Sequence, residues 1–406
     1  MTVNAKTLGE NIAKLRKKNK MTQAELAECL HVSNKAVSKW ESGAGYPAIE
    51  QLPVLASVFG ISVDYLLCGE KKGIVIAGTT LTDIVKNIEH YPDCGMLTNV
   101  SDITYSLGGC APNTAVNLIK IDRSIPVSVC GKIGMDDNGR YVLSQLQMKG
   151  IGTDKIVFSR DTETGFTDVM SLPTGERTFF HKKGANADFC PADIDLSALN
   201  CDILHIGYIL LLDRFDAPDK EYGTVMARFL HDAQEKGIKT STDVVSNSSA
   251  DYGKAIIPAL KYCNYAIMNE IEACGIWKLN PRKSDGGLDK ANVKIAMRKM
   301  AECGVSDKVI VHAKELSLIL DIASGVIAEV TSLNIPKEEI KGSVGAGDAF
   351  CAGCLYGLYN GYSDRQILEF ASAAAACSLF AANAVDGMKP KNEILKLQDK
   401  YGRLAV

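Results

Sequence analysis

The sequence predicts two domains of different fold class: an all-α domain at the N-terminus, then an α/β domain with a largely parallel central sheet flanked by helices. First, apolar residues recur at helical spacing within residues 1–68. Second, short apolar runs alternate with helical segments from Gly73 on, as in parallel sheets. Third, 406 residues exceed what one ordinary core organises. We therefore place the domains at 1–68 and 74–406, with a short linker at 69–73.

Composition favours a cytoplasmic protein with no membrane partner. Hydrophobic residues make up 46% of the chain, yet no run of eighteen apolar residues occurs and the first residues lack a signal-peptide core. Thirteen cysteines, an odd number scattered through apolar segments, predict reduced thiols rather than a disulfide framework. Cys351 and Cys354 form a close pair, but a second pair at zinc-ligand spacing is missing. We expect these two to be packing residues.

The first domain is predicted to be helical and basic. Residues 1–72 contain ten Lys or Arg and seven Asp or Glu, about +3, whereas the remainder carries about −6. Leu8, Ile12 and Leu15 predict an amphipathic helix over 6–19 that ends in a basic run. Thr22 and Ser33 are good N-caps for helices over 23–30 and 34–41. A further helix through Phe59 and the segment 63–67 complete the domain.

This pattern, with Met21-Thr22-Gln23 opening the second helix and Val37 to Glu41 closing the third, resembles the phage-repressor and Cro (XRE-like) type of helix-turn-helix over residues 8–68. The resemblance implies that the third helix enters the major groove of double-stranded DNA and that the protein is a homodimer. The side chains that the resemblance places at bases or phosphates are Gln23, Asn34, Lys35, Ser38 and Lys39. The alternative is a helical interaction or dimerisation module whose charges are a solvated face.

The second domain is predicted to hold two kinds of strand. Apolar runs at 74–76, 126–129, 203–206, 266–268 and 309–311 predict buried strands of a largely parallel sheet. Polar and apolar residues instead alternate around 101–107 and 165–181. We expect these segments to form a small, half-exposed β lid over a site.

The stretch Gly342 to Phe350 predicts a phosphate site at the start of a helix. The run Gly345-Ala346-Gly347 lets backbone N–H groups approach an anion, and the helix dipole favours negative charge there. Asp348 lies in the same first turn, where a carboxylate can take the proton of a hydroxyl. The alternative is an ordinary capped helix whose Asp favours the dipole.

Further motifs surround this stretch in the sequence. Asp83 follows the first predicted strand, where ligands of open α/β folds bind. Asn269 and Glu272 lie one turn apart after another strand, which suits holding water around Mg²⁺. Gly-rich turns carry the remaining candidates for polyol contacts and for closure over a substrate, namely Gly108, Gly109, Asn113 and Asn186.

In order and spacing these motifs resemble the PfkB, or ribokinase-like, family of sugar and nucleoside kinases over residues 73–390. The resemblance implies ATP-dependent phosphorylation of a hydroxyl, with Asp348 as base and Gly345, Ala346 and Gly347 as the anion hole. It places Asn269 and Glu272 near Mg²⁺ and phosphate. Its sugar-contact positions match Asp83, Gly109 and Asn113, and the identity of the sugar or nucleoside stays open.

The chain departs from the family pattern at three places. Where the family has Thr-x-Gly-x-x-Gly around the nucleotide, this chain has His312 to Ser317, in which Lys314 could reach phosphate or side chains could narrow the ATP pocket. Gly342 stands where many members carry an Asp that helps place a monovalent cation, so dependence on potassium is not implied. Cys110 replaces a lysine of some relatives.

Two functional hypotheses follow from these motifs. The first is an active sugar or nucleoside kinase fused to a DNA-binding domain, so that sugar state is coupled to transcription. The second is a transcription regulator whose kinase fold only senses a sugar, which the altered segment 312–317 favours.

Overall fold

The computed structural model describes residues 4–68, 72–174, 176–245 and 252–405, and it divides into two compact units, Met1–Lys72 and Gly73–Val406. The greater part of the predicted linker, residues 69–71, lies outside the described residues. Among the described residues, no helix combines the length and the apolar character needed to cross a membrane. The cysteines that the structure describes are free thiols.

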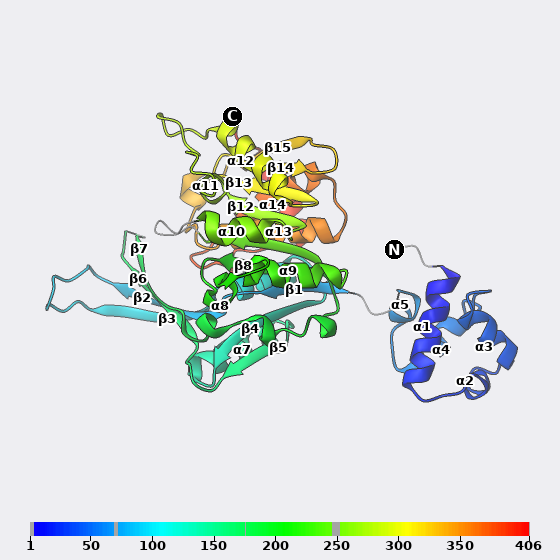
Figure 1. Ribbon diagram of the computed structural model, residues 1–406. Helices are drawn as coiled ribbons and strands as arrows, with labels where there is room; N and C mark the ends of the chain where they lie inside the picture. The colour runs from blue at the N-terminus through cyan, green and yellow to red at the C-terminus, as the bar shows by residue number, and fades with distance from the viewer. Residues whose placement is uncertain (1–3, 69–71, 175, 246–251, 406) are drawn as a thin grey trace. The chain divides into compact units, whose positions relative to one another are not determined.

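The N-terminal unit is all-α, as predicted (Figure 1). Thr22 caps the second helix in a reciprocal capping box with Glu25, and Ser33 caps the third helix through the N–H of Ala36. Gly60, at φ +66°, ends the fourth helix in the left-handed conformation. The helices are α1 (Ala5–Lys18), α2 (Gln23–Cys29), α3 (Asn34–Glu41), α4 (Gln51–Phe59) and α5 (Val63–Cys68).

An ion pair and a hydrogen bond to the same carboxylate connect the first three helices. Arg16 on α1 donates from Nε to Glu41 Oε1 of α3 at 2.6 Å, and Gln23 of α2 donates to Glu41 Oε2 at 2.8 Å. The Arg16 and Glu41 side chains are only 11% and 8% exposed, so neither charge is well solvated without the other. Trp40, one residue before Glu41, packs in the apolar core of the unit.

The central sheet of the second unit has the strand order β15-β14-β13-β12-β11-β8-β1-β4-β5. It is parallel from β5 to β13, and β14 and β15 are added antiparallel at one edge. The strands are β1 (Gly73–Ala77), β4 (Val127–Gly134), β5 (Gly152–Ser159), β8 (Cys201–Ile209), β11 (Lys239–Val244), β12 (Tyr265–Asn269), β13 (Lys308–His312), β14 (Leu316–Asp321) and β15 (Ile327–Thr331). The five apolar runs that predicted buried strands all lie in this sheet.

Helices cover both faces of the sheet, because side chains alternate along each buried strand (Figure 1). Ile74 and Ile76 join one core, while Val75 and Ala77 join the other. The first core is completed by α6 (Cys110–Ile121), α7 (Asp137–Met148), α13 (Ala346–Tyr359), α14 (Asp364–Ser378) and α15 (Lys391–Tyr401). The second is completed by α8 (Asp213–Asp216), α9 (Val225–Glu235), α10 (Tyr252–Leu260), α11 (Glu270–Gly275) and α12 (Lys290–Cys303).

A separate four-stranded sheet of order β3-β2-β6-β7 forms the predicted lid. Figure 1 shows β2 and β3 as a hairpin that extends away from the central sheet. Asp83, expected at the carboxyl end of the first strand of the central sheet, instead lies inside a strand of this second sheet. The strands are β2 (Leu81–Ile88), β3 (Val100–Gly108), β6 (Gly165–Ser171) and β7 (Arg177–Lys182). The minor elements of the unit are β9 (Pro218–Asp219), β10 (Gly223–Thr224) and the 3₁₀ turns at 184–188, 191–193, 196–198 and 337–339.

We predict that Glu41→Gln destabilises the N-terminal unit by about 3 kcal/mol, because it leaves the buried Arg16 charge without its partner. Urea unfolding of the full chain measures this if the background carries Trp277→Phe, since Trp40 is then the one tryptophan left in the sequence. Glu28→Gln, an exposed position on α2, is the matched control and should change stability by less than about 0.5 kcal/mol. Equal effects of the two substitutions would contradict the assigned role of the ion pair.

Candidate active site

Polar side chains gather where the parallel strands of the central sheet end. The loops after parallel strands share one edge of the sheet, so residues that are distant in sequence meet there. A cavity of about 260 Å³ lies at this edge. Its lining includes Tyr208 of β8, Asp243 of β11, Asn269 of β12, His312 of β13 and Asp348 of α13.

The N-terminus of α13 opens into this cavity. Gly345 is its N-cap with φ +77°, and a Cβ there would lie 2.3 Å from the Cβ of Ala384, so glycine is required at this position. A Cβ on Gly347 would meet nothing within 4 Å, which leaves open space beside its backbone. The first N–H groups of a helix have no acceptor within the helix. Gly345, Ala346 and Gly347 thus form the helix start at which the sequence predicts an anion site, and the N–H of Ala346 donates to the carbonyl of Ser343 at 3.3 Å.

Asp348 lies in the first turn of α13 and is 4% exposed. Its Oδ2 accepts a hydrogen bond from Nδ2 of Asn113 at 2.9 Å, and its Oδ1 accepts one from the hydroxyl of Tyr208 at 3.1 Å. Burial raises the pKa of this carboxyl to about 7, and the negative charges of Asp243 and Asp83 act in the same direction. A carboxyl with this pKa exchanges protons near neutral pH, as a general base does.

Asp83 belongs to the lid and approaches the same region. Burial raises its pKa to about 7, against the hydrogen bond from Thr167 and the charge of Arg177. A Cβ on Gly108 would lie 2.5 Å from Oδ1 of Asp83, so Gly108 makes room for this carboxyl. The predicted role of Gly108 at the substrate is therefore indirect, because the glycine leaves space for the Asp83 side chain.

Asn113 offers an acceptor next to the candidate base. It lies in the first turn of α6 and is 6% exposed. Its Nδ2 is used by Asp348, while its Oδ1 has no hydrogen-bond partner among the described residues. Gly109, at φ +89°, forms the turn before α6, where a Cβ would lie 2.3 Å from the carbonyl oxygen of Thr79. A buried, unpaired carbonyl beside a carboxylate fits the hydroxyl groups of a polyol.

The side chain of Asn186 is hydrogen-bonded to the backbone of Thr80 and Lys183. Its Oδ1 accepts from the N–H of Thr80 at 2.7 Å, and its Nδ2 donates to the carbonyls of Thr80 and Lys183 at 3.1 and 2.9 Å. The side chain is 1% exposed. The predicted substrate contact is therefore better described as positioning of the turn at Thr80, because both side-chain groups already have backbone partners.

Asn269 and Glu272 form a reciprocal capping box at the start of α11. Oδ1 of Asn269 accepts from the N–H of Glu272 at 2.8 Å, and Oε2 of Glu272 accepts from the N–H of Asn269 at 3.0 Å. Both residues line the cavity with the N-terminus of α13. Amide and carboxylate oxygens are hard ligands, so this donor set fits a Mg²⁺ ion held through water.

His312 and Lys314 lie toward a second cavity. This space of about 400 Å³ is lined by His312, Lys314 and mostly apolar residues such as Leu333, Phe350 and Leu379. The His312 ring lies 4.6 Å from that of Phe350, and burial lowers its pKa to about 4, so it is neutral at pH 7. His312 lines both cavities, whereas Lys314 lines the apolar one. An apolar cavity beside an anion site fits a nucleotide base next to its phosphates.

Tyr208 and Asp243 are site residues that the sequence did not indicate. Tyr208 has φ +61°, and its N–H donates to Oδ1 of Asp243 at 2.6 Å. Asp243 is 8% exposed, at the end of a strand whose segment Lys-Thr-Ser-Thr-Asp-Val carries too few apolar residues to predict a buried strand. For Tyr208 a signal existed, because it follows the predicted strand 203–206 at its carboxyl end.

In the N-terminal unit, the polar face of α3 is available to a partner. The four side chains that the sequence assigns to DNA on this helix are exposed, namely Asn34, Lys35, Ser38 and Lys39. Gln23 differs, because its amide already donates to Glu41.

The family follows from a comparison of sequences. The pfkB family carbohydrate kinase model matches residues 71–392, and a helix-turn-helix model matches residues 12–66. The chain belongs to the pfkB family of carbohydrate kinases. Its pfkB domain is 25% identical over 334 residues to a 5-dehydro-2-deoxygluconokinase of Clostridium beijerinckii, which covers 76% of this chain and 90% of that protein.

A solved structure supports the same fold. The ribokinase of Arabidopsis thaliana, complexed with ribose and ATP, superimposes with a TM-score of 0.65 at 22% identity and covers 80% of this chain and 98% of that one. The N-terminal part is 43% identical over 82 residues to the HTH-type transcriptional activator BcrR of Enterococcus faecalis. That match covers 20% of this chain and 40% of the activator.

We predict that Asp348→Asn stabilises the protein at pH 8 by up to about 3 kcal/mol, because the native carboxyl resists ionisation that the unfolded chain allows. Its pKa is raised to about 7 in the folded state, so the native state binds the extra proton between about pH 4 and 7. The wild-type protein therefore loses stability as pH rises through that window, and the variant loses less, because only other raised carboxyls such as Asp83 still contribute.

Thermal unfolding at pH 5 and pH 8 measures this effect, with Asp137→Asn, an exposed position, as the control. The gain of Asp348→Asn should shrink at pH 5. A loss of stability at pH 8, or a gain that does not change with pH, would show that the buried carboxyl is not under this strain.

Proposed function

We propose that the protein is an ATP-dependent sugar kinase in which Asp348 is the general base, fused to a DNA-binding domain that couples sugar state to transcription. The observation that carries the proposal is the buried Asp348 beside the unpaired Oδ1 of Asn113, at the open N-terminus of α13. Asp348 and the start of α13 line one cavity, and Asn113 is hydrogen-bonded to Asp348. A base, an anion site and an acceptor for a polyol placed together in this way are what phosphoryl transfer to an alcohol needs.

The acceptor hydroxyl is bound and activated by the residues around Asp348. Asp83 and Asn113 accept hydrogen bonds from the other hydroxyls of the sugar and so orient it. Asp348 takes the proton of the reacting hydroxyl onto a carboxylate oxygen as that oxygen attacks. With the pKa of the free carboxyl near 7, a large fraction is ionised and able to act at neutral pH.

The backbone of α13 stabilises the charge that develops on the transferred group. Bound ATP with Mg²⁺ supplies the phosphoryl group and neutralises part of its charge. Backbone N–H groups of Gly345, Ala346 and Gly347 would donate to the developing anion, with that of Ala346 giving up its bond to the carbonyl of Ser343, and the positive end of the helix dipole adds to their effect. Asn269 and Glu272 would hold Mg²⁺ through water, and the apolar cavity beside His312 would hold the base of the nucleotide.

The N-terminal unit would bind double-stranded DNA through α3. Lys35 and Lys39 supply phosphate or base contacts, and Asn34 and Ser38 supply hydrogen bonds to base edges. Because such domains read palindromes as dimers, we propose a homodimer that places two units on two half-sites.

The second candidate is a sugar sensor without turnover. It is favoured by His312 to Ser317, where side chains replace the glycines of the family pattern. It is also favoured by the neutral His312 ring, which lines both cavities and lies tilted against the ring of Phe350. In that case the same cavity binds a sugar and the fold changes DNA affinity without phosphoryl transfer.

Turnover separates the two candidates. We predict sugar-dependent release of ADP by the purified full chain, with a rate that rises with pH through about 7 as Asp348 ionises, and at least a thousandfold lower rate in Asp348→Asn. A panel of pentoses, hexoses, sugar acids and nucleosides identifies the substrate, and Asp137→Asn is the control. A sugar that binds in calorimetry but is never phosphorylated would favour the sensor.

DNA binding is tested separately on duplexes selected by the full chain from a random pool. We expect Lys35→Ala to weaken binding about tenfold through loss of a contact by α3. Lys14→Ala, an exposed lysine on α1, removes the same charge and should change affinity less than about twofold. Equal losses in both variants would indicate general electrostatic attraction, and no selected duplex at all would favour a dimerisation module.

A further inference from the structure

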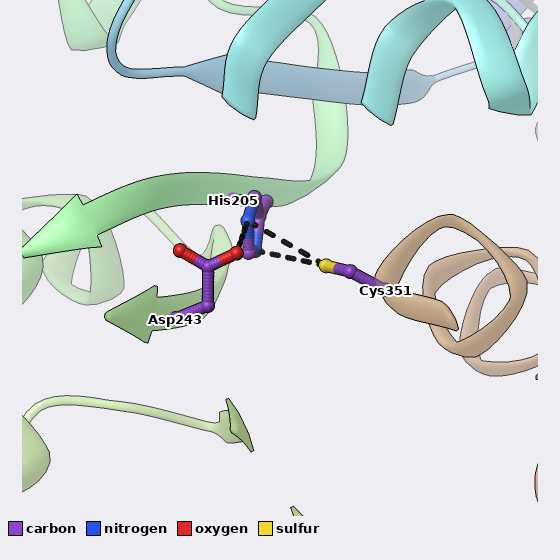
Figure 2. Close-up of side chains that lie close together, drawn as sticks. All are labelled: His205, Asp243 and Cys351. Carbon is purple, nitrogen blue, oxygen red and sulfur yellow. Dashed lines mark hydrogen bonds and ion pairs between the residues drawn. The ribbon is translucent and has the colours of Figure 1, made fainter. Parts of the chain in front are cut away.

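Three side chains of different chemistry meet beside the cavity that contains Asp348. His205 comes from β8, Asp243 from β11 and Cys351 from α13. Figure 2 shows them pointing toward one another from these separate elements. All three are buried, with exposed fractions of 0%, 8% and 1%. One imidazole, one carboxylate and one thiol are a donor set that binds transition metals.

The distances match a tetrahedral metal site. Nε2 of His205 lies 3.5 Å from Oδ2 of Asp243 and 3.6 Å from Sγ of Cys351, and all three ligand atoms lie within 4.8 Å of one another. Ligands bound to zinc at the usual bond lengths with tetrahedral angles are separated by about 3.3–3.6 Å. Two of the three ligand pairs therefore already have the spacing that a Zn²⁺ ion requires, and the third pair, Oδ2 of Asp243 and Sγ of Cys351, lies within 4.8 Å.

The ring of His205 is oriented as a ligand. Its Nδ1 lies 3.0 Å from the hydroxyl of Ser241 on the neighbouring strand β11. When Nδ1–H donates to that hydroxyl, Nε2 carries the lone pair. Nε2 is the ring nitrogen nearer to both partners, at 3.5 Å from Oδ2 of Asp243 and 3.6 Å from Sγ of Cys351, while Sγ lies 3.9 Å from Nδ1. A hydrogen bond of this kind from the second ring nitrogen is the usual support of a metal-bound histidine.

The charges of the cluster balance those of a divalent cation. Asp243 and a Cys351 thiolate each carry one negative charge, and the imidazole ligand is neutral. A bound M²⁺ ion makes the buried site neutral overall, which removes most of the cost of burying the two anions. Mg²⁺ is disfavoured, because a thiolate and an imidazole are softer ligands than it prefers.

The cluster is reachable from the candidate active site. Asp243 and Cys351 line the cavity of about 260 Å³ together with Asp348. Three protein ligands leave a fourth tetrahedral position, and its opening toward a cavity is typical of metals that exchange or bind an added ligand. The hard oxygen pair Asn269 and Glu272 lines the same cavity but offers a different donor set.

We propose that His205, Asp243 and Cys351 form a binding site for a thiophilic divalent cation of the Zn²⁺ class, with its fourth position facing the cavity of Asp348. Metal binding at this site requires neither nucleotide nor sugar, so it can be tested independently of the kinase activity. No pattern in the sequence indicates this site, and Cys351 is predicted there to be a packing residue. Cys354, one turn further on the same helix, does pack in the apolar core.

The experiment uses Co²⁺ as a spectroscopic probe in the full chain, stripped of metal with a chelator under anaerobic, reducing conditions. Cys29→Ser and Cys94→Ser form the background, because these two thiols are exposed. We expect one equivalent of Co²⁺ to give tetrahedral ligand-field bands and a thiolate-to-cobalt charge-transfer band, which Zn²⁺ abolishes and Mg²⁺ does not. Elemental analysis gives the stoichiometry.

Variants assign the band to the cluster. Cys351→Ala should abolish the charge-transfer band and weaken Zn²⁺ binding by about two orders of magnitude, while Cys354→Ala, equally buried on the same helix, should keep both. If Cys351→Ala does not fold, as judged by near-ultraviolet circular dichroism, Asp243→Asn replaces it, because the amide oxygen still accepts the N–H of Tyr208. Absence of the band in the background protein, its survival in Cys351→Ala, or an unchanged Co²⁺ affinity in Asp243→Asn would overturn the proposal and leave a hydrogen-bonded cluster.

Discussion

The burial of the Asp348 carboxyl is the constraint on which the rest of the site depends. An acid withdrawn from water is unstable as an anion, and here it is tolerated because Asn113 on α6 and Tyr208 on β8 each donate one hydrogen bond to it. These contacts tie two helix N-termini to the edge of the sheet. The two hydrogen bonds do not fully offset the burial, so the pKa of Asp348 stays raised to about 7. A pKa near 7 suits a general base but lowers the stability of the folded protein at neutral pH.

Close backbone approach is the second requirement of this arrangement. Gly345 and Gly109 adopt positive φ where a Cβ would collide with neighbouring backbone or side chain, and Gly108 leaves the space that Asp83 occupies. The lid therefore reaches the central sheet through residues chosen for their small size. The backbone of Tyr208 is also strained, because φ +61° is unfavourable for a large side chain. Its hydroxyl donates to Asp348 from this conformation.

Local patterns predicted most of the elements and failed where polar residues are buried. Helices α2, α3 and α13 follow from caps and glycines, and five strands follow from apolar runs. Strand β11 was not predicted, because its Ser and Thr residues are typical of loop sequences. In the structure these hydroxyls are buried; Thr242, for example, donates to the carbonyl of Ile206 on the neighbouring strand at 2.9 Å. Asp83 was assigned to the end of the first strand, because its pairing with the lid strands is long-range and leaves no local pattern.

By itself the sequence determined the two fold classes, the helix that begins at Gly-Ala-Gly-Asp and the chemistry of its first turn, because caps, glycines and hydrophobic period act over a few residues. The tertiary structure alone decided what surrounds that turn. Tyr208 and Asn113 lie 140 and 235 positions from Asp348, and His205 lies 146 from Cys351, yet each pair is in contact. Parallel strands bring their carboxyl ends to one edge however far apart they are in the chain, and no local pattern records that meeting.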